Sequence, residues 1–509
     1  MSTAHLATDI VAHHAVRHPA DPALEGVDDG ATRSWEELEY RVSLVAGMLS
    51  DRFGIGAGDR VVAVAQNDIR FFELQFALMR LRAILVPLNW RLALPELRGM
   101  VTDADPKLIV HDQPLNELSR TLASDSSIPR LSWGCADGEV DYETDLVGAR
   151  SVGPSRESLL RDITHVLYTS GSTGVPKGVM LSRENMIWNF LNSREDKLIT
   201  GRGDRMFNPM PNFHAGGLSA LANPILLAGG CVAVAQRVDA DQMVQVMGDP
   251  DRAMTHSTGV VTIYQMMLDS KAWTDADFSS MRYLECGGGR IPAKLADAMR
   301  AKGLILQSVY GSTETGPAVT QMPREHAAAR PNSIGLAVPY THIRLVAPDG
   351  SDVPTGDIGE VWLSGPSITP GYWGKDRATD PSFEGPWFKT GDAARVDTAG
   401  FYEAVDRYKR MYKSGGENVF PSEVEALLIN HPDVNEIAII GVPDTRWGET
   451  GLAIVSTRSR EPIDLEELSR FAAGRIARYK LPTRLTMVGE MPHNATGKID
   501  LNRLQKTYR

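Results

Sequence analysis

Residues 168–178 (YTSGSTGVPKG) form a glycine- and hydroxyl-rich segment directly after a strand-like run, residues 163–168. Glycine lets backbone N–H groups turn toward an anion, and serine and threonine hydroxyls add further donors. The familiar P-loop places Lys directly before Ser or Thr, whereas here Pro176 precedes Lys177 and Gly178 follows it. The segment therefore predicts a phosphate-binding loop of another kind at the end of a strand. A solvated turn is the alternative, because Gly, Ser and Thr gather in loops for conformational reasons alone.

Helix-like and strand-like segments alternate in the first part of the chain. Residues 61–65 and 84–86 look like buried strands, and residues 70–82 look like a helix between them. Such alternation predicts an α/β fold with layered sheets. We expect a large N-terminal domain over residues 1–408. Within it, the polar and turn-rich residues 134–161 predict a surface connection.

The pattern changes after residue 406. Residues 422–425 (SEVE) have the capping-box pattern at the start of a short helix. Residues 434–442 predict a strand, and residues 465–477 predict an amphipathic helix. These elements fit a small α+β domain of common size, which we place at residues 409–509.

Charge and cysteine usage exclude some classes of protein. The 509 residues include 53 Lys and Arg against 64 Asp and Glu, which gives a net charge of −11. A chain this acidic is not expected to be a general nucleic-acid binder. The wide spacing of Cys135, Cys231 and Cys286 predicts neither a disulfide framework nor a metal knuckle, and it suits a reducing cytoplasm.

One uncharged segment, residues 215–235, is long enough to span a bilayer. Three pairs of residues interrupt it: Gly216-Gly217, Asn223-Pro224 and Gly229-Gly230. We therefore predict a short helix, a turn and a buried strand there, and no transmembrane segment.

A second motif, residues 310–316 (YGSTETG), combines a carboxylate, a hydroxyl and an aromatic ring. Glu314 offers oxygen ligands of the kind that Mg²⁺ prefers together with substrate phosphates. Thr313 offers a hydroxyl to a phosphate, and Tyr310 offers a ring face to a purine. The alternative is an ordinary helix start, with Thr313 as the cap and Glu314 in the first turn.

Three further signals lie toward the C-terminus. Asp392, after Thr390-Gly391, is placed to accept ribose hydroxyls, and Arg407 to hold the ribose or a phosphate. Lys498, after a Thr-Gly pair, can be carried on a loop into a site built by another domain. Each has a plain alternative: a tight turn, a surface salt-bridge cluster and a solvated lysine.

Taken together, the order and spacing of these motifs resemble the core motifs of the adenylate-forming superfamily, which holds acyl-CoA synthetases, peptide-synthetase adenylation domains and beetle luciferases. The resemblance covers nearly the whole chain. Its segments are residues 168–178, 211–214, 287–289, 310–314, 390–392, 406–409, 414–418 and 497–498. Within the superfamily the chain looks most like free-standing acyl-CoA synthetases of the fatty-acyl or coumarate/ferulate type. We expect no carrier-protein domain after Lys498, and this expectation disfavours a peptide-synthetase module.

The resemblance implies an AMP-forming carboxylate:CoA ligase that uses ATP, coenzyme A and Mg²⁺. A small-molecule carboxylic acid would first become an acyl-adenylate, and the thiol of coenzyme A would then take the acyl group. Lys498 would bridge the acid and the α-phosphate, and the small domain would rotate about the hinge residue Lys409. A stand-alone adenylating enzyme that loads an acyl carrier protein is the alternative, as is a nucleotide-binding protein without catalysis.

The resemblance also assigns residues to subsites. The catalytic residues would be Lys498, His214, Thr313 and Glu314. The ATP and AMP site would take Thr169, Ser170, Gly171, Ser172, Thr173, Gly174, Lys177, Gly288, Gly289, Arg290, Tyr310, Gly311, Ser312, Thr313, Asp392, Arg407 and Lys498. The acyl pocket would take His214, Gly287, Val309, Pro317 and Ala318. Coenzyme A would meet Lys413, Ser414, Gly415 and Gly416, and the metal Thr169 and Glu314.

Some positions leave the substrate open between fatty and aromatic acids. Lys413 matches the aryl type, whereas many fatty acyl-CoA ligases have an aliphatic residue there. Val309 stands where glycine is usual and narrows one wall of the acyl slot. Gly289-Arg290 replaces Ala-Pro. His214 is expected to gate the thiol tunnel or to polarise the intermediate, with a buried core histidine as the alternative. We also expect the enzyme to be cytoplasmic and able to form a homodimer.

Overall fold

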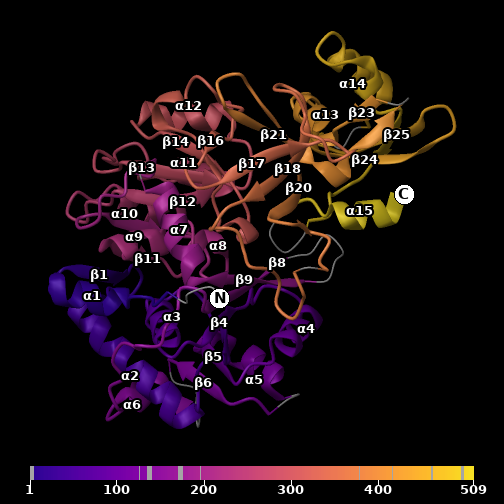
Figure 1. The fold of residues 1–509 in the computed structure, drawn as a ribbon. Helices are drawn as coiled ribbons and strands as arrows, with labels where there is room; N and C mark the ends of the chain where they lie inside the picture. Colours follow the sequence, from indigo (N-terminus) through magenta and orange to yellow (C-terminus); the bar gives the residue numbers. More distant parts are fainter. Residues whose placement is uncertain are drawn as a thin grey trace. The chain divides into compact units, whose positions relative to one another are not determined.

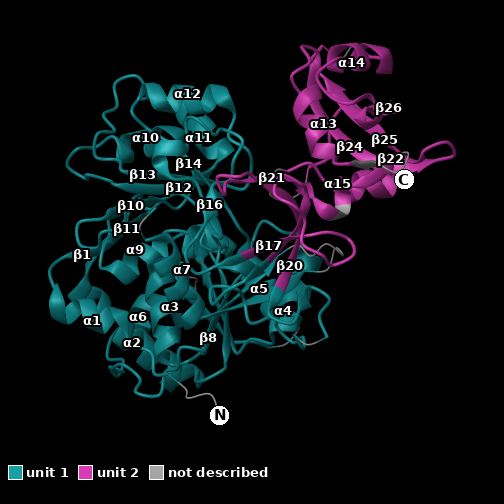
Figure 2. Cartoon of the chain, turned by 45° about the horizontal axis from the view of Figure 1, so that its top comes forward, with its two compact units in different colours: residues 1–342, 363–387 teal, residues 343–362, 388–509 magenta. Residues whose placement is uncertain are grey.

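The computed structural model describes residues 5–124, 127–134, 140–169, 176–194, 196–377, 379–414, 417–459, 462–493 and 498–508. The chain divides into two compact units (Figure 2). Unit 1 comprises residues 1–342 and 363–387, and unit 2 comprises residues 343–362 and 388–509. The predicted domain boundary between residues 408 and 409 is the point about which we expect the C-terminal domain to rotate. It stays a prediction.

Unit 1 contains a seven-stranded and a nine-stranded sheet (Figure 1). The first runs in the order β7 (Val140–Asp141), β6 (Arg130–Trp133), β5 (Leu108–Asp112), β3 (Arg60–Val64), β4 (Ile84–Pro87), β8 (Ile163–Thr169), β9 (Lys177–Ser182). The second runs in the order β16 (Leu336–Ala337), β15 (Thr320–Gln321), β14 (Leu306–Tyr310), β13 (Tyr283–Gly287), β12 (His256–Val260), β10 (Arg205–Asn208), β11 (Cys231–Val234), β1 (Pro22–Gly26), β2 (Thr32–Ser34). The strands from β10 to β14 are parallel, so the loops that follow them gather at one edge of the sheet.

The helices of unit 1 and one further short strand complete it. They are α1 (Ile10–Arg17), α2 (Trp35–Phe53), α3 (Arg70–Arg80), α4 (Leu94–Ala104), α5 (Asn116–Ser124), α6 (Tyr142–Leu146), α7 (Arg183–Ser193), α8 (Ala215–Leu218), α9 (Ala222–Ala228), α10 (Ala240–Met247), α11 (Val261–Leu268), α12 (Ala293–Ala301) and β19 (Phe383–Glu384). The mixed α/β class is therefore as predicted.

Several local predictions are confirmed in unit 1. The two predicted early strands are β3 and β4, and the predicted helix between them is α3, most of which is buried. The uncharged segment 215–235 contains α8, α9 and the wholly buried β11, as its Gly and Pro interruptions indicate. Over the described part of the chain, no helix combines the length and apolar character that a membrane crossing requires.

One prediction in unit 1 is wrong. Residues 134–161 were expected to form a surface connection, yet their described part includes β7 and α6. The ring of Tyr142 in α6 is fully buried, and its hydroxyl donates to Glu73 Oε2 at 3.1 Å. Its partner lies far back in the chain, so the polar local composition does not reveal this burial.

Unit 2 contains strands of two sheets in which most neighbouring strands are antiparallel. The first has the order β17 (His342–Val346), β18 (Gly359–Ser364), β20 (Trp387–Val396), β19, with β21 (Tyr402–Arg407) also beside β20. The second has the order β23 (Glu417–Val419), β22 (Tyr412–Ser414), β25 (Gly448–Thr457), β24 (Val434–Asp444), with β26 (Arg484–Met487) beside β25. The helices are α13 (Pro421–Leu428), α14 (Leu465–Ala472) and α15 (Leu501–Tyr508).

The start of α13 differs from the predicted capping box. The helix begins at Pro421, and its N-cap residue, Phe420, makes no side-chain cap. The N–H of Ser422 donates instead to Asp406 Oδ2 at 2.8 Å. Proline is well placed in the first turn, where its missing N–H is not needed, and a carboxylate from β21 does the capping. The predicted strand at residues 434–442 is confirmed as β24.

Candidate active site

Glu314 lies in a tight turn directly after β14. A Cβ atom on Gly311 would lie 1.7 Å from the carbonyl oxygen of Pro317, so a side chain cannot be accommodated there. The N–H of Ser312 donates to Thr315 Oγ1 at 2.8 Å, which stabilises the short 3₁₀ helix Thr313–Thr315. The cap is thus Ser312 and not Thr313, and Glu314 follows in the first turn.

The carboxylate of Glu314 is held by hydroxyl groups on both oxygens. Ser312 Oγ donates to Oε2 at 2.8 Å, and Tyr372 Oη donates to Oε1 at 3.2 Å. The side chain is half-buried. A carboxylate oriented in this way is a hard oxygen ligand of the kind that suits Mg²⁺.

Lys177, at the start of β9, lies beside the same tyrosine. Its Nζ is 4.5 Å from the centre of the Tyr372 ring and 3.9 Å from Asp380 Oδ2. One tyrosine therefore contacts two of the predicted site residues, Lys177 and Glu314. Burial, and then the Glu314 carboxylate, raise the pKa of Tyr372, so its hydroxyl stays protonated and donates.

The glycine-rich loop itself falls largely outside the described residues. Thr169 and Lys177 pair with each other in the antiparallel β8–β9 ladder, so the hairpin brings the two ends of the loop together. Ser170, Gly171, Ser172, Thr173 and Gly174 lie outside the described residues. Their role as a phosphate cradle stays a prediction.

The predicted acyl-pocket residues are partly brought together by β13 and β14. A Cβ on Gly287 would lie 3.4 Å from Val309 Cγ1, so these positions face each other on neighbouring strands. Gly288 has a φ of +76° and is exposed, as are Gly289 and Arg290. Tyr310, Val309 and Pro317 are half-buried, whereas Ala318 is buried.

His214 caps α8 and is exposed, so the core-histidine alternative is wrong. Its Nδ1 accepts the N–H of Gly216 at 3.0 Å. In the neutral ring this acceptor role leaves the proton on Nε2, because one ring nitrogen accepts and the other donates. The histidine can therefore offer an N–H to an oxygen atom of a ligand.

In unit 2, Asp392 and Arg407 form an ion pair. Arg407 Nε lies 2.9 Å from Asp392 Oδ1, and the two residues are register partners in the β20–β21 ladder. Gly391 has a φ of +72°, which makes the turn before Asp392 favourable for glycine. The N–H of Asp392 donates to Thr390 Oγ1 at 3.0 Å. The motif thus presents a carboxylate and a guanidinium side by side.

The remaining predicted residues of unit 2 lie at three places. Lys498 is exposed, and His493 forms an isolated antiparallel bridge with Ile499. Lys413 is exposed on β22 and Ser414 is buried next to it. Gly415 and Gly416 lie outside the described residues, and Lys409 lies in the 3₁₀ helix Tyr408–Arg410.

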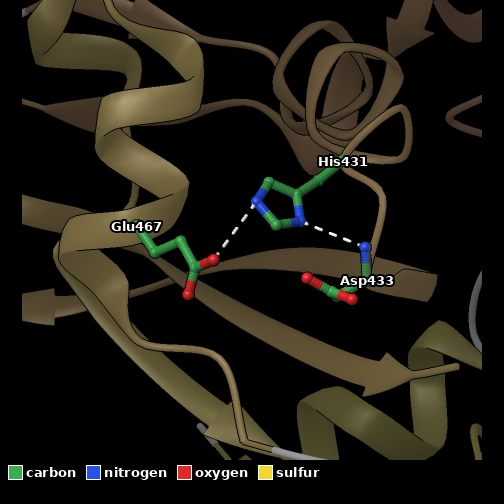
Figure 3. A group of neighbouring side chains, drawn as sticks. All are labelled: His431, Asp433 and Glu467. Atoms are coloured by element: carbon green, nitrogen blue, oxygen red, sulfur yellow. Dashed lines mark hydrogen bonds and ion pairs between the residues drawn. The ribbon is translucent and has the colours of Figure 1, made fainter. Parts of the chain in front are cut away.

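A group of potential metal ligands in unit 2 was not predicted (Figure 3). His431 Nε2 lies 3.7 Å from Glu467 Oε1, while Nδ1 accepts the N–H of Asp433 at 3.3 Å. A metal at Nε2 would require the proton on Nδ1, where it would face that N–H. His431 also packs edge-on against Phe471, with ring centres 5.0 Å apart. The group is therefore best explained as a structural link between the end of α13 and α14.

Family comparisons agree with this arrangement of motifs. Residues 11–373 match the AMP-binding enzyme family, and residues 423–498 match the AMP-binding enzyme C-terminal domain. The chain belongs to the AMP-binding enzyme family. These matches, together with relatives that are CoA ligases, confirm the prediction of an adenylate-forming enzyme of the acyl-CoA synthetase type.

Relatives of this AMP-binding enzyme cover nearly all of its length. It is 37% identical over 470 residues to the feruloyl-CoA synthase of an Amycolatopsis species, which covers 92% of this chain and 93% of that protein. It is 33% identical over 475 residues to the indoleacetate–CoA ligase of Aromatoleum aromaticum, with coverage of 92% and 91%. The crystal structure of ATP-bound MatB from Rhodopseudomonas palustris superimposes with a TM-score of 0.87 at 30% identity and covers 98% of both chains.

Tyr372 of this AMP-binding enzyme contacts both Glu314 and Lys177 but was not predicted from the sequence. It lies in a segment, residues 369–373, without helical or strand periodicity. Its partner Glu314 is 58 residues earlier in the chain. Gly371 directly before it has a φ of +146°, a conformation that favours glycine.

Proposed function

We propose that this AMP-forming acyl-CoA synthetase activates an aromatic carboxylic acid. The feruloyl and indoleacetate ligases that it resembles are named for aromatic acids. Lys413, which is exposed beside the buried Ser414, matches the residue found at this position in the aryl type of the family. Val309 Cγ1 would lie 3.4 Å from a Cβ on Gly287, and in our proposal this valine narrows one wall of the acyl slot.

The reaction has two steps. A carboxylate oxygen attacks the α-phosphorus of ATP, the bond from that phosphorus to the bridging oxygen breaks, and pyrophosphate leaves. The coenzyme A thiol then loses its proton to solvent and attacks the acyl carbonyl, and AMP leaves as the thioester forms. The products are acyl-CoA, AMP and pyrophosphate.

The first step must overcome repulsion between anions. Two unit charges 4 Å apart repel by about 4 kcal/mol at an effective dielectric constant near 20. In our proposal Lys498 lies between the acid and the α-phosphate, and Lys177 steadies the leaving pyrophosphate. Asp392 and Arg407 hold the ribose, and Tyr310 stacks on the purine.

Glu314 fits a magnesium ligand, because hydroxyl donors fix both carboxylate oxygens of a half-buried side chain. Mg²⁺, when bound there with Thr169, would neutralise phosphate charge. His214 offers its Nε2 proton to the acyl carbonyl oxygen, which stabilises negative charge as the thiol adds. Rotation about Lys409 would exchange Lys498 for the face that carries Lys413 and Ser414.

The observation that supports the adenylation chemistry is the Glu314 carboxylate, fixed by two hydroxyls near Lys177. The proposed aromatic substrate class is supported by the feruloyl and indoleacetate relatives. The test is pyrophosphate release with a panel of hydroxylated aromatic, indole-type and aliphatic acids. We expect release to need an acid, AMP to accumulate with coenzyme A, and aromatic acids to have the higher kcat/KM. Release of ADP, or a preference for holo-carrier protein over coenzyme A, would contradict it. The cytoplasmic location and the homodimer stay predictions.

A further inference from the structure

Tyr372 joins two charged groups of the site through two different parts of its side chain. Its hydroxyl donates to Glu314 Oε1 at 3.2 Å, and its ring lies 4.5 Å from the Nζ of Lys177. The side chain is only 5% exposed. A hydrogen bond to a carboxylate and a cation against a ring are both stronger when water is excluded.

The backbone around Tyr372 is itself tied to both partners. The N–H of Thr369 donates to the carbonyl of Glu314 at 2.7 Å. On the other side, Tyr372 forms a bridge with Val179 in β9, and the N–H of Trp373 donates to Gly178 O at 2.7 Å. The segment 369–373 therefore spans from the Glu314 turn to the strand that begins with Lys177.

Asp380 is a second group that positions the ammonium of Lys177. Its carboxylate is 3.9 Å from Lys177 Nζ and is 4% exposed. The ring of Tyr372 limits the ammonium on one side and the carboxylate attracts it on another. A long lysine side chain that is not held in this way loses more rotamer entropy when it binds a phosphate.

We propose that Tyr372 is a positioning residue that aims the Glu314 carboxylate with its hydroxyl and seats the Lys177 ammonium with its ring. The proposal rests on the function proposed above, because it assigns Glu314 to a metal–nucleotide complex and Lys177 to pyrophosphate. The hydroxyl and the ring of Tyr372 have roles that can be separated by mutation. Removal of the hydroxyl affects the metal side alone, whereas removal of the ring affects both.

The test compares Tyr372→Phe with Tyr372→Leu. For Tyr372→Phe we expect the dissociation constant of Mn²⁺ in the enzyme–ATP complex, measured by electron paramagnetic resonance, to rise about tenfold, as for a lost hydrogen bond to a charged group. The KM for pyrophosphate in the reverse reaction should stay within about twofold, because the ring remains. Tyr372→Leu should raise both quantities.

The matched control is Tyr142→Phe. Tyr142 also donates its hydroxyl to a buried carboxylate, Glu73, at 3.1 Å, but it lies outside the site. This variant should lose thermal stability and leave Mn²⁺ binding unchanged. If Tyr142→Phe weakens Mn²⁺ binding as much as Tyr372→Phe, the positioning role is overturned in favour of general destabilisation.

A double-mutant cycle with Ser312 tests whether Tyr372 acts through Glu314. Ser312→Ala removes the donor to the other oxygen of Glu314. With Tyr372→Phe it forms a double-mutant cycle, and we expect the combined effect on Mn²⁺ binding to differ from the product of the single effects. Multiplicative effects, or unchanged Mn²⁺ binding in Tyr372→Phe, would overturn the proposal. The metal-binding readout needs no acid, so failure to activate any acid would count against the proposed function alone.

Discussion

Lys197 Nζ and Glu285 Oε2 lie 2.7 Å apart in an ion pair whose side chains are 0% and 4% exposed. Glu285 precedes Gly287 by two positions on β13, so both residues face the same side of the sheet. Lys197 also donates to the carbonyl of Ala220 at 2.7 Å, and Thr258 Oγ1 donates to Glu285 Oε1 at 3.2 Å. Glu285, on the same side of β13 as Gly287, is thus held in a buried pair whose charges neutralise each other.

Breaking this pair should destabilise the protein strongly. Lys197→Met leaves Glu285 buried without its counter-charge, and the expected loss is about 3–5 kcal/mol. Denaturant unfolding followed by intrinsic fluorescence measures it. The exposed Lys271→Met is the control and should change stability by less than about 0.5 kcal/mol. The combination of Lys197→Met with Glu285→Leu should recover stability, and an additive loss would contradict the ion-pair explanation.

Removal of Lys498 should separate the two half-reactions. Lys498→Ala is expected to lower acid-dependent pyrophosphate release by at least about 100-fold, as for the loss of a preorganised charge at a transition state. Thioester formation from supplied acyl-adenylate should remain within about threefold, because that step does not need the cation between two anions. Lys506→Ala, an exposed lysine of α15, is the control. Equal losses in both half-reactions would contradict the two-face mechanism.

The motifs predicted the family and the chemistry because their residues are contiguous in the chain. Lys177 and Glu314 each lie within a short pattern whose composition already suits a phosphate or a metal. Tyr372 could not be predicted in this way, because its role depends on a contact with a residue 58 positions earlier. Periodicity likewise predicted α3, which is defined by its own residues, more closely than α13.

The start of α13 shows why the edges of elements are harder to predict. Ser422 and Glu425 have the spacing of a capping box, but tertiary contacts use both differently. Asp406 accepts the N–H of Ser422, and Glu425 Oε1 accepts the N–H of Ile439 at 2.6 Å. Both residues are therefore committed to partners outside the helix, and local pattern alone could not reveal this.

The backbone at Lys409 should matter for the second half-reaction only. Lys409→Pro fixes φ and removes an N–H donor, so we expect acid-dependent pyrophosphate release to persist while coenzyme A turnover falls at least about tenfold. Lys409→Ala keeps the backbone freedom and serves as the control. Single-turnover assays of each half-reaction distinguish the variants. Normal coenzyme A turnover in Lys409→Pro would exclude this residue as the hinge.

A buried histidine should make stability depend on pH. Burial lowers the pKa of His165 to about 4, whereas the unfolded chain has the ordinary value of 6.5. Between these values the unfolded state binds the proton and the folded state does not, so stability falls as the pH falls from about 6.5 toward 4. The slope is at most about 1.4 kcal/mol per pH unit for this group.

Thermal melts from pH 7.5 to 4.5 test this origin. His165 Nε2 pairs with Gln75 Oε1 at 3.0 Å, so His165→Gln keeps a polar partner and removes the titration. The variant should start from lower stability but lose less of it as the pH falls. The exposed His5→Gln is the control. An unchanged pH slope in His165→Gln would assign the effect to other groups.

The width of the acyl slot should be set by Val309. Its Cγ1 lies where it would contact a Cβ on Gly287 at 3.4 Å, so Val309→Gly opens space on the wall that these two positions share. We expect kcat/KM to rise about tenfold for aromatic acids with an added ring substituent relative to the unsubstituted acids, a difference of the size that one or two buried carbon groups provide. Gly287→Ala, which narrows the same wall, should shift the ratio in the opposite direction. Because glycine in a strand weakens it, Val309→Gly should also cost about 1 kcal/mol of stability, and Val309→Ala tests the pocket effect with a smaller penalty. If all three variants change kcat/KM equally for both sets of acids, Val309 does not line the acyl slot.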